Sequence, residues 1–523
     1  MQGKKPYTEK LFNNFQLSER VPKDNFYRML KEALNLQFVR TATAQYYGSE
    51  GQKSIDPEVF FKLLLVGYLE NLNSDRRIIE HAKMRLDILY FIGYDIDEEL
   101  PWHSTISRTR QLYGEEVFLK LFREVLKQCI DKGMVRGKRQ ALDSALIKAN
   151  ASLDSLAEKE VLDDVATYSE ELNENSDYKV SAEKKKRVEY HHRWKAKEYK
   201  DQPGHNRKDK PEDGEKLIRG KYLSNHTHYS TTDPDARIAV KPGKARQMNY
   251  FAQIAVDDAH HVITAAKSDY ADQRDSQCLA ALVNQASDNL QENELKIEQL
   301  TADTGYSSAE ALRYLKFQNI DAYIPNFGQY KPEREGFVYN KEQDQYECQR
   351  GNKAVLPFKK IQYSHDNYGM KTYRSSETAC KSCSLRKECC GEKTFFKKIQ
   401  HSVDKPLYDA MHAKMQTPYA KRISRIRSST VEPVLGTLIN FLNMKRINTR
   451  GIKQANKHII MAATAYNLKK LLKWKDNKRI SVPNPIKILA KSTKKAEFLT
   501  MCILRRCLTY LKPKKILPLY SLS

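Results

Sequence analysis

Residues 139–150 set the strongest constraint on what this chain can fold into. Their side chains alternate as in a β-strand, and Asp143 falls on one face together with Ala145 and Ile147. An acid among small and apolar neighbours is costly to remove from water unless it is paired or binds a cation. The segment therefore predicts a core strand that carries an acid with a functional partner.

Two later acids occur in contexts that suit such a partner. Asp303 follows the short strand-like run 297–300, and Glu432 opens a stretch with the apolar spacing of an amphipathic helix. We expect Asp143, Asp303 and Glu432 to converge on one divalent-metal site, because carboxylate oxygens favour Mg2+ or Mn2+. An alternative is that Glu432 only stabilises a helix N-terminus through the dipole, with residues 428–430 as the cap.

The periodicity around these acids predicts a mixed α/β fold. The expected order is the Asp143 strand, a charged insertion, a strand pair over 250–266, a helix at 274–290, the Asp303 strand, a helix at 308–318 and a last strand. Sites on such sheets tend to lie at strand ends, which is where these acids are expected.

Residues 1–136 predict a helical region. Asp56 followed by Pro57 marks a helix start, with an N-cap acid and a proline at the first helical position. Further short helices follow, and the last of them carries Arg108 and Arg110. Such a unit resembles a helix-turn-helix DNA reader, which makes both arginines candidates for DNA contacts. The pattern alone is equally compatible with an ordinary helical bundle.

The positive charge is concentrated near the end of the chain. The whole sequence has a net charge of +25, and residues 411–523 hold 25 Lys and Arg against three acids. A segment of this kind favours polyanions, because phosphate contacts release counterions. A solvated tail is the alternative, but helical periodicity argues for nucleic acid. The candidate contacts there are Arg425, Arg427, Lys445, Arg446 and Arg450.

A group of cysteines lies between the second and third acids. Cys380 and Cys383 form a Cys-x2-Cys pair, Cys348 precedes them, and Cys389 and Cys390 follow. Four such thiols can hold one structural Zn2+ ion, and a reducing compartment disfavours disulfides. Buried free thiols are the alternative.

Length and composition suit a large water-soluble protein. A chain of 523 residues exceeds the size of one core, so two or three domains are expected. The start of the chain lacks the apolar core of a signal peptide, and the longest apolar runs, such as 63–69, are too short to cross a bilayer. We expect a cytoplasmic protein with no membrane partner.

Several ordered motifs carry a family resemblance. Residues 56–110 resemble the N-terminal domain of bacterial insertion-sequence transposases. The rest is similar to their catalytic part in the motifs ALDSALIKANAS, STTDPDARIAV, LTADTGYSS, CKSCSLRKEC and VEPVLGTLINF. The chain resembles most the IS eleven-eighty-two branch of the DDE transposases.

The resemblance implies a ribonuclease-H-like core, with Asp143 and Asp303 on strands and Glu432 on a helix. It also implies a transposase that binds the terminal inverted repeats of a mobile element and catalyses metal-dependent strand cleavage and strand transfer. Two Mg2+ or Mn2+ ions would serve each site. The partner would be double-stranded DNA, both element ends and target, in the bacterial nucleoid. Because an element has two ends, we expect a homodimer on DNA.

The expected domains follow from this reading. Residues 1–136 would form the helical DNA-binding domain and 137–475 the catalytic domain, interrupted by a charged insertion at 155–222 and a cysteine-cluster insertion at 340–400. Residues 476–523 would form a basic tail.

The chain departs from a signature of related families. Their Tyr-x2-Arg-x3-Glu-x6-Lys pattern around the glutamate is replaced here by Arg425, Ser428 and Ile439, and Arg427 is a candidate substitute for the missing arginine. Two alternatives stay open: an inactive transposase-derived DNA-binding protein, and a structure-specific nuclease that never rejoins strands.

Overall fold

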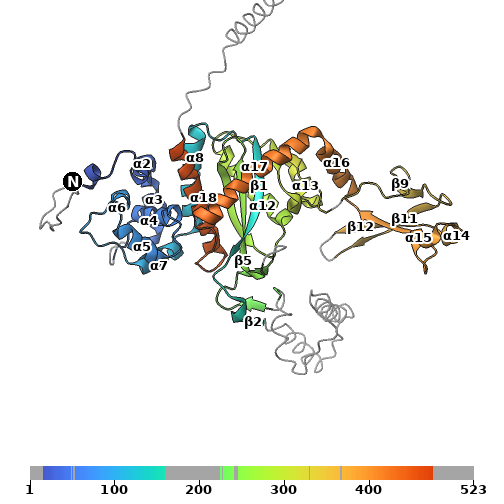
Figure 1. Ribbon diagram of the computed structural model, residues 1–523, viewed down its shortest axis with the longest axis horizontal. Coiled ribbons are helices and arrows are strands. Elements are labelled where there is room, and N and C mark those ends of the chain that lie inside the picture. Colours follow the sequence, from blue (N-terminus) through green and yellow to red (C-terminus); the bar gives the residue numbers. More distant parts are fainter. Residues whose placement is uncertain are drawn as a thin grey trace, which may run out of the picture. The chain divides into compact units, whose positions relative to one another are not determined.

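A computed structural model describes residues 16–48, 50, 54–158, 224–225, 228–240, 245–328, 330–364 and 368–474 (Figure 1). The expected insertion at 155–222 lies outside the described residues except for 155–158. The expected tail at 476–523 lies outside them entirely.

A mixed sheet forms the centre of the described chain, and the predicted Asp143 strand lies in its middle. Among the described residues the sheet has six strands, in the order β4-β5-β1-β7-β8 with β6 also paired to β5. They are β1 (Arg139–Lys148), β4 (Arg237–Ala239), β5 (Gln247–Asp257), β6 (Ile263–Tyr270), β7 (Gln299–Thr301) and β8 (Asp321–Tyr323). A separate short pair consists of β2 (Leu156–Glu158) and β3 (His228–Ser230), after the 3-10 turn η2 (Leu153–Ser155).

The pairing of β1 fixes where its acid lies. β1 runs antiparallel to β5, with Asp143 opposite Ile254, and parallel to β7, with Ala141 opposite Thr301. β7 in turn runs parallel to β8. The predicted order of strands and helices in this region is confirmed, including the strand pair, which is the hairpin of β5 and β6.

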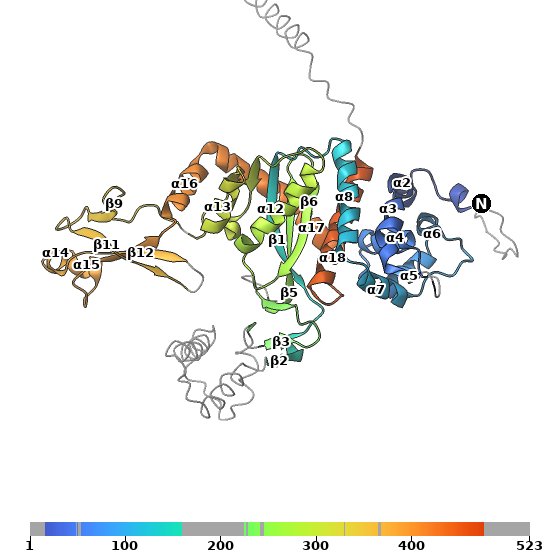
Figure 2. The same cartoon turned by 180° about the vertical axis from the view of Figure 1, so that it is seen from behind.

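Helices cover both faces of this sheet. α12 (Asp275–Gln291) contacts β5 and β6. It lies with α13 (Ala309–Phe317) on the side seen in Figure 2. α17 (Pro418–Phe441) contacts β1 and crosses the opposite face, seen in Figure 1. α16 (Lys405–Gln416) precedes it and contacts β8 and α13.

The N-terminal region is helical, as predicted. Asp56 caps α4 by accepting a hydrogen bond from the Glu58 backbone N–H at 2.8 Å. The helices are α1 (Leu17–Arg20), α2 (Phe26–Ala33), α3 (Gln37–Thr43), the 3-10 turn η1 (Ala44–Tyr46), α4 (Pro57–Leu69), α5 (Asp75–Lys83), α6 (Leu86–Ile92), α7 (His103–Leu112) and α8 (Glu115–Asp131).

The buried helix α18 (Ile452–Lys473) joins these helices to the sheet. His458 Nδ1 accepts from the Tyr68 hydroxyl of α4 at 2.9 Å. On another side of the helix, the Asn467 amide pairs with the Ile263 backbone of β6 in both directions, at 3.0 and 2.8 Å. The described residues up to Leu471 accordingly belong to one compact unit.

A second sheet lies between β8 and α16 in the chain, and we call residues 337–402 the β9–β13 module. Its antiparallel order is β13-β12-β11-β10-β9. A small core of Tyr346, Leu356, Tyr373 and Ile399 holds it together. The module contains β9 (Phe337–Asn340), β10 (Gln345–Cys348), β11 (Val355–Tyr363), β12 (Gly369–Arg374), α14 (Glu377–Lys381), α15 (Arg386–Cys390) and β13 (Lys398–Ser402). In the described part of the chain, no helix is long and apolar enough to span a bilayer.

Candidate active site

Asp143 and Asp303 lie at matching registers of the parallel pair β1 and β7, Asp143 within β1 and Asp303 two residues beyond the end of β7. Each lies two residues beyond the paired Ala141 and Thr301. Asp143 Oδ1 accepts from the Ser144 N–H at 2.8 Å, and Asp303 Oδ1 accepts from the Gly305 N–H at 3.0 Å. Asp303 thereby caps η3 (Thr304–Tyr306) just beyond the end of β7, whereas Asp143 lies in the middle of β1 and not at a strand end as expected.

Glu432 lies deep in α17 rather than at its start. The helix begins at Pro418, where the Thr417 hydroxyl accepts from the Ala420 N–H at 3.2 Å. The expectation that residues 428–430 cap the helix is therefore wrong, because they lie inside it. A dipole role for Glu432 is excluded too, since the residue follows the N-terminus by about four turns.

Arg427 brings the first and third acids together. Its Nη1 lies 3.4 Å from Asp143 Oδ2 and its Nη2 lies 3.4 Å from Glu432 Oε1. The side chains of Arg427 and Asp143 are only 15% and 16% exposed, whereas Glu432 is 59% exposed. α17 thus presents a guanidinium to β1, with Glu432 at the open side of the pair.

A buried polar network, missed by the sequence analysis, lies beside the two aspartates. The Tyr306 hydroxyl donates to Gln253 Oε1, and Gln253 Nε2 donates to Asp275 Oδ1 at 3.4 Å. Burial raises the pKa of Tyr306 well above its ordinary value, and the charges of Asp275, Asp143 and Asp303 raise it further. Asp143, Asp275 and Asp303 therefore all lie close enough to this buried phenol to affect its pKa. Asp275 could not be singled out from the sequence, because an acid in the first turn of a helix is common.

The carboxylates around Gly305, in the Asp303 motif, explain why a glycine occupies this position. A methyl group added at Gly305 would lie 2.5 Å from Asp275 Oδ2 and 3.2 Å from Asp303 Oδ1. The two carboxylates therefore flank this glycine, and any side chain there would displace one of them.

The three predicted acids have the donor chemistry for Mg2+, since all their ligand atoms are carboxylate oxygens. Among the described residues, however, no three His, Cys, Asp or Glu side chains are grouped closely enough to hold a metal ion. Arg427 supplies the positive charge between Asp143 and Glu432 instead. A metal site here would require the guanidinium to move.

The predicted zinc site finds no support. Cys348, Cys380, Cys383, Cys389 and Cys390 line one cavity of about 210 Å³, but no three of them are grouped as metal ligands in the described structure. Burial, followed by the neighbouring Cys389 and Cys380, raises the pKa of the Cys390 thiol to about 11. The Cys348 thiol donates to the Arg350 carbonyl at 2.6 Å. The described cysteines form no disulfide, and of these five only Cys380 is buried, so the alternative of buried free thiols does not describe the cluster either.

The candidate DNA contacts of the helical region divide into two kinds. Arg108 is exposed, and among the described residues its guanidinium bonds only within its own helix, to Ser104. The Arg110 side chain is 14% exposed and forms a two-pronged ion pair with Asp75, with Nη1 at 3.0 Å from Oδ2. The Arg110 guanidinium thus joins α7 to α5, and its expected DNA contact stays a prediction.

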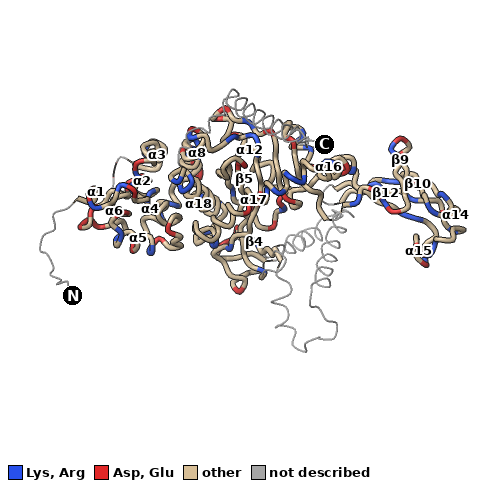
Figure 3. The backbone as a smooth tube through the Cα atoms, turned by 45° about the horizontal axis from the view of Figure 1, so that its top comes forward, with Lys and Arg blue, Asp and Glu red and all other residues tan. Residues whose placement is uncertain are grey.

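The candidate basic residues near the three acids are mostly exposed, and Figure 3 marks where Lys and Arg lie along the backbone. Arg446 donates to Asn150 Oδ1 at 2.9 Å and lines an open groove of about 530 Å³ together with Lys148. The exposed candidates are Arg425, Lys445, Arg446 and Arg450, whereas Arg427 is turned toward the acids.

Comparison with known families gives two matches. Residues 15–112 match the Transposase domain (DUF772), and residues 347–472 match the Transposase DDE domain. The second match contains Glu432 and Arg427, while Asp143 and Asp303 precede it. No curated protein matched the chain. The helical region (15–112) and the region 347–472 are thus each similar to a transposase domain. Together the two matches support an insertion-sequence transposase.

Proposed function

We propose that this chain is a DDE transposase whose active site is formed by Asp143, Asp303 and Glu432. One observation carries the proposal. Asp143 on β1 and Asp303, just beyond the neighbouring parallel strand β7, lie beside a helix whose arginine contacts Asp143 and Glu432. The family resemblance implies two acids from the sheet and one from a helix in a ribonuclease-H-like core, and these three residues would take those places.

The acids would hold the metal ions of the reaction. Two bound Mg2+ ions would activate the attacking oxygen and stabilise the leaving oxygen. Asp143, Asp303 and Glu432 would hold these ions through their carboxylate oxygens. Their backbone hydrogen bonds orient Asp143 and Asp303 before any ion arrives.

The role of Arg427 in this scheme follows from its distances to Asp143 and Glu432. Charge-assisted hydrogen bonds are ordinarily ~2.7–2.9 Å long, so two contacts at 3.4 Å show a guanidinium shared loosely between Asp143 and Glu432. We infer that it balances the acids without metal. On metal binding it would turn to the DNA phosphate, which its forked geometry suits.

No side chain is required as the nucleophile. Tyr306 is the hydroxyl nearest to the aspartates in this network, but it is fully buried, donates to Gln253 and has a strongly raised pKa. A neutral phenol so held cannot attack a phosphodiester. Water would cut the strand, and a DNA 3′-hydroxyl would join it to the target.

The remaining expectations are part of the same proposal. Residues 1–136 would bind an element end through Arg108, and residues 137–475 would cut it, with Arg425, Lys445 and neighbouring cations on the phosphates. A homodimer on DNA would process both ends. The IS eleven-eighty-two branch is the family group we propose.

The test is a strand-cleavage and strand-transfer assay. Inverted repeats in the DNA flanking the gene define a substrate duplex, which is incubated with purified chain, target plasmid and Mg2+. The proposal predicts cut ends that become covalently joined to the target. Cut but never joined ends would indicate a nuclease, and binding without cutting would indicate an inactive derivative.

A further inference from the structure

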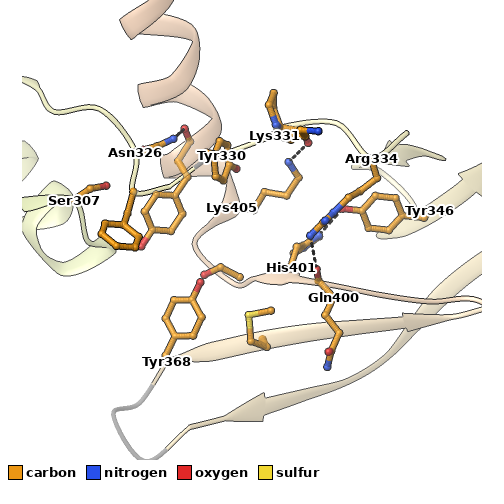
Figure 4. Close-up of a pocket in the computed structure, with 15 residues that line it drawn as sticks. Ser307, Asn326, Tyr330, Lys331, Arg334, Tyr346, Tyr368, Gln400, His401 and Lys405 are labelled. Carbon is orange, nitrogen blue, oxygen red and sulfur yellow. Dashed lines mark hydrogen bonds between the residues drawn. The ribbon is translucent and has the colours of Figure 1, made fainter. Parts of the chain in front are cut away.

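A second cavity of about 300 Å³ lies between the core and the β9–β13 module (Figure 4). Ser307 and Asn326 lie on one side of it, and Tyr346, Gln400 and His401 lie on the other. This volume is at the lower end of the range for small-ligand pockets, ~300–1,000 Å³. The cavity is therefore large enough for one flat ring system.

Aromatic rings form much of its wall. Tyr330, Tyr346 and Tyr408 belong to the lining, as do the rings of Phe327 and Tyr368. Phe327 is 77% exposed and Tyr368 is 46% exposed, so these two rings stand open to solvent at the cavity. Exposed aromatic faces beside an aromatic wall are suited to stacking on a nucleobase.

The polar lining favours an anion beside that ring. None of the described lining residues is acidic, and Lys331 and Arg334 are exposed cations at its edge. Lys405 is buried and already bonded to Asp409, at 2.8 Å, and to the Pro332 carbonyl. Arg334 Nη2 donates to the Gln400 carbonyl at 3.3 Å and leaves its other guanidinium N–H groups, with Lys331, for a phosphate.

Two buried polar atoms of the lining lack partners in the described structure. They are Ser307 Oγ and Asn326 Oδ1. The Asn326 amide is oriented by its Nδ2, which donates to the Tyr408 carbonyl at 2.7 Å. Leaving a buried polar group unsatisfied is unfavourable. Asn326 Oδ1 is thus an acceptor in the cavity wall for which the described residues supply no donor.

We propose that this cavity binds one unpaired nucleotide of a DNA strand, with its base among the aromatic rings and its phosphate on Arg334 and Lys331. The inference rests on the proposed function, because DNA brings the nucleotide. The turn η3 connects the two sites: it is capped by Asp303, and Ser307 directly follows it. A strand held at the acids could therefore place a neighbouring nucleotide in the cavity.

The test compares two duplexes of one sequence, one blunt and one with a single unpaired terminal nucleotide, bound to the full chain in EDTA. Base–aromatic stacking predicts that the wild type prefers the unpaired end by about 5- to 140-fold. Phe327→Ala and Tyr368→Ala should each reduce this preference several-fold. Phe317→Ala removes an equally exposed ring outside the cavity and should preserve it.

Equal binding of both duplexes by the wild type would overturn the proposal, as would a preference that survives both cavity substitutions. Free dAMP that competes as strongly as the unpaired duplex would also overturn it, since the cavity would then serve free nucleotides. The assay contains no metal, so it is independent of cleavage. If the wild type prefers the unpaired end but does not cut DNA in the separate assay with Mg2+, only the proposed function is contradicted.

Discussion

At the scale of single residues, Arg427 decides the charge balance of the site. Its guanidinium contacts Asp143 and Glu432, which would otherwise face each other without a cation. Arg427→Gln should therefore lower the Mg2+ concentration for half-maximal cleavage by about two- to fivefold, the equivalent of an ion pair worth up to ~1 kcal/mol. The maximal rate should fall, because the phosphate contact is lost. Mg2+ titration of cleavage measures both. An unchanged Mg2+ dependence would show that Arg427 does not compete with metal.

Two glycines provide a matched pair at the same scale. Gly305→Ala should destabilise the fold by about 1–3 kcal/mol, because the methyl group meets the Asp275 and Asp303 carboxylates. Gly436 lies inside α17 with nothing within 4 Å of an added methyl group, so Gly436→Ala should stabilise by about 0.5–1 kcal/mol. Urea denaturation of both variants checks this. Equal changes in the free energy of unfolding of the two variants would contradict the predicted clash at Gly305.

At the scale of elements, buried His458 links α18 to α4. Burial lowers its pKa to about 4 from 6.5, and its ring bonds the Tyr68 hydroxyl and the Asn443 carbonyl. The folded state keeps this histidine neutral, so the unfolded state binds more protons between pH 6.5 and 4. Stability should therefore fall as the pH falls through that window, by about 3 kcal/mol for this residue.

The measurement is the free energy of unfolding at pH 7 and pH 4.5. His458→Gln keeps a polar side chain but cannot titrate, so its stability should depend less on pH than that of the wild type. The buried His401 also has its pKa lowered to about 4, and it should retain its own part of the dependence. A variant with the full wild-type slope would contradict the assignment to His458.

Sequence patterns predicted those elements whose packing is visible as periodicity. β1, β5 and α12 carry the spacing of buried strands and of a one-sided helix, and the structure has them where expected. The β9–β13 module gave no such signal. Its strand β11 is exposed over nearly its whole length and contains Pro357, so neither alternation nor an apolar run marks it.

The site was predictable in part, for a similar reason. Asp143 and Asp303 stand out because each is polar in an apolar context that the sheet buries. The start of α17 was placed too late, since its basic first half hides the buried Ala420 and Ile423 that pack on Tyr323. The contact of Arg427 with Asp143 joins residues that are 284 positions apart in the sequence, and no local sequence pattern predicts such a contact.

At the scale of the whole molecule, the charge distribution predicts a strong salt dependence of DNA binding. Residues 411–523 hold 25 Lys and Arg against three acids. The log–log slope of affinity against salt should decrease by about 0.9 for each phosphate contact removed. Deleting residues 476–523 should therefore flatten it. Filter binding over a salt series measures the slope, and an unchanged slope would show that this segment does not contact DNA.

The central claim is that Asp143, Asp303 and Glu432 act as one metal site. The most direct measurement is Mg2+-dependent cleavage by Asp143→Asn, Asp303→Asn and Glu432→Gln, each alone, with DNA binding measured in parallel. Asp97→Asn, which neutralises an exposed acid in the helical region, serves as the control. The account predicts that all three site variants bind DNA yet lose cleavage, while the control keeps both. Near-wild-type cleavage by any one of the three would contradict the claim for that residue.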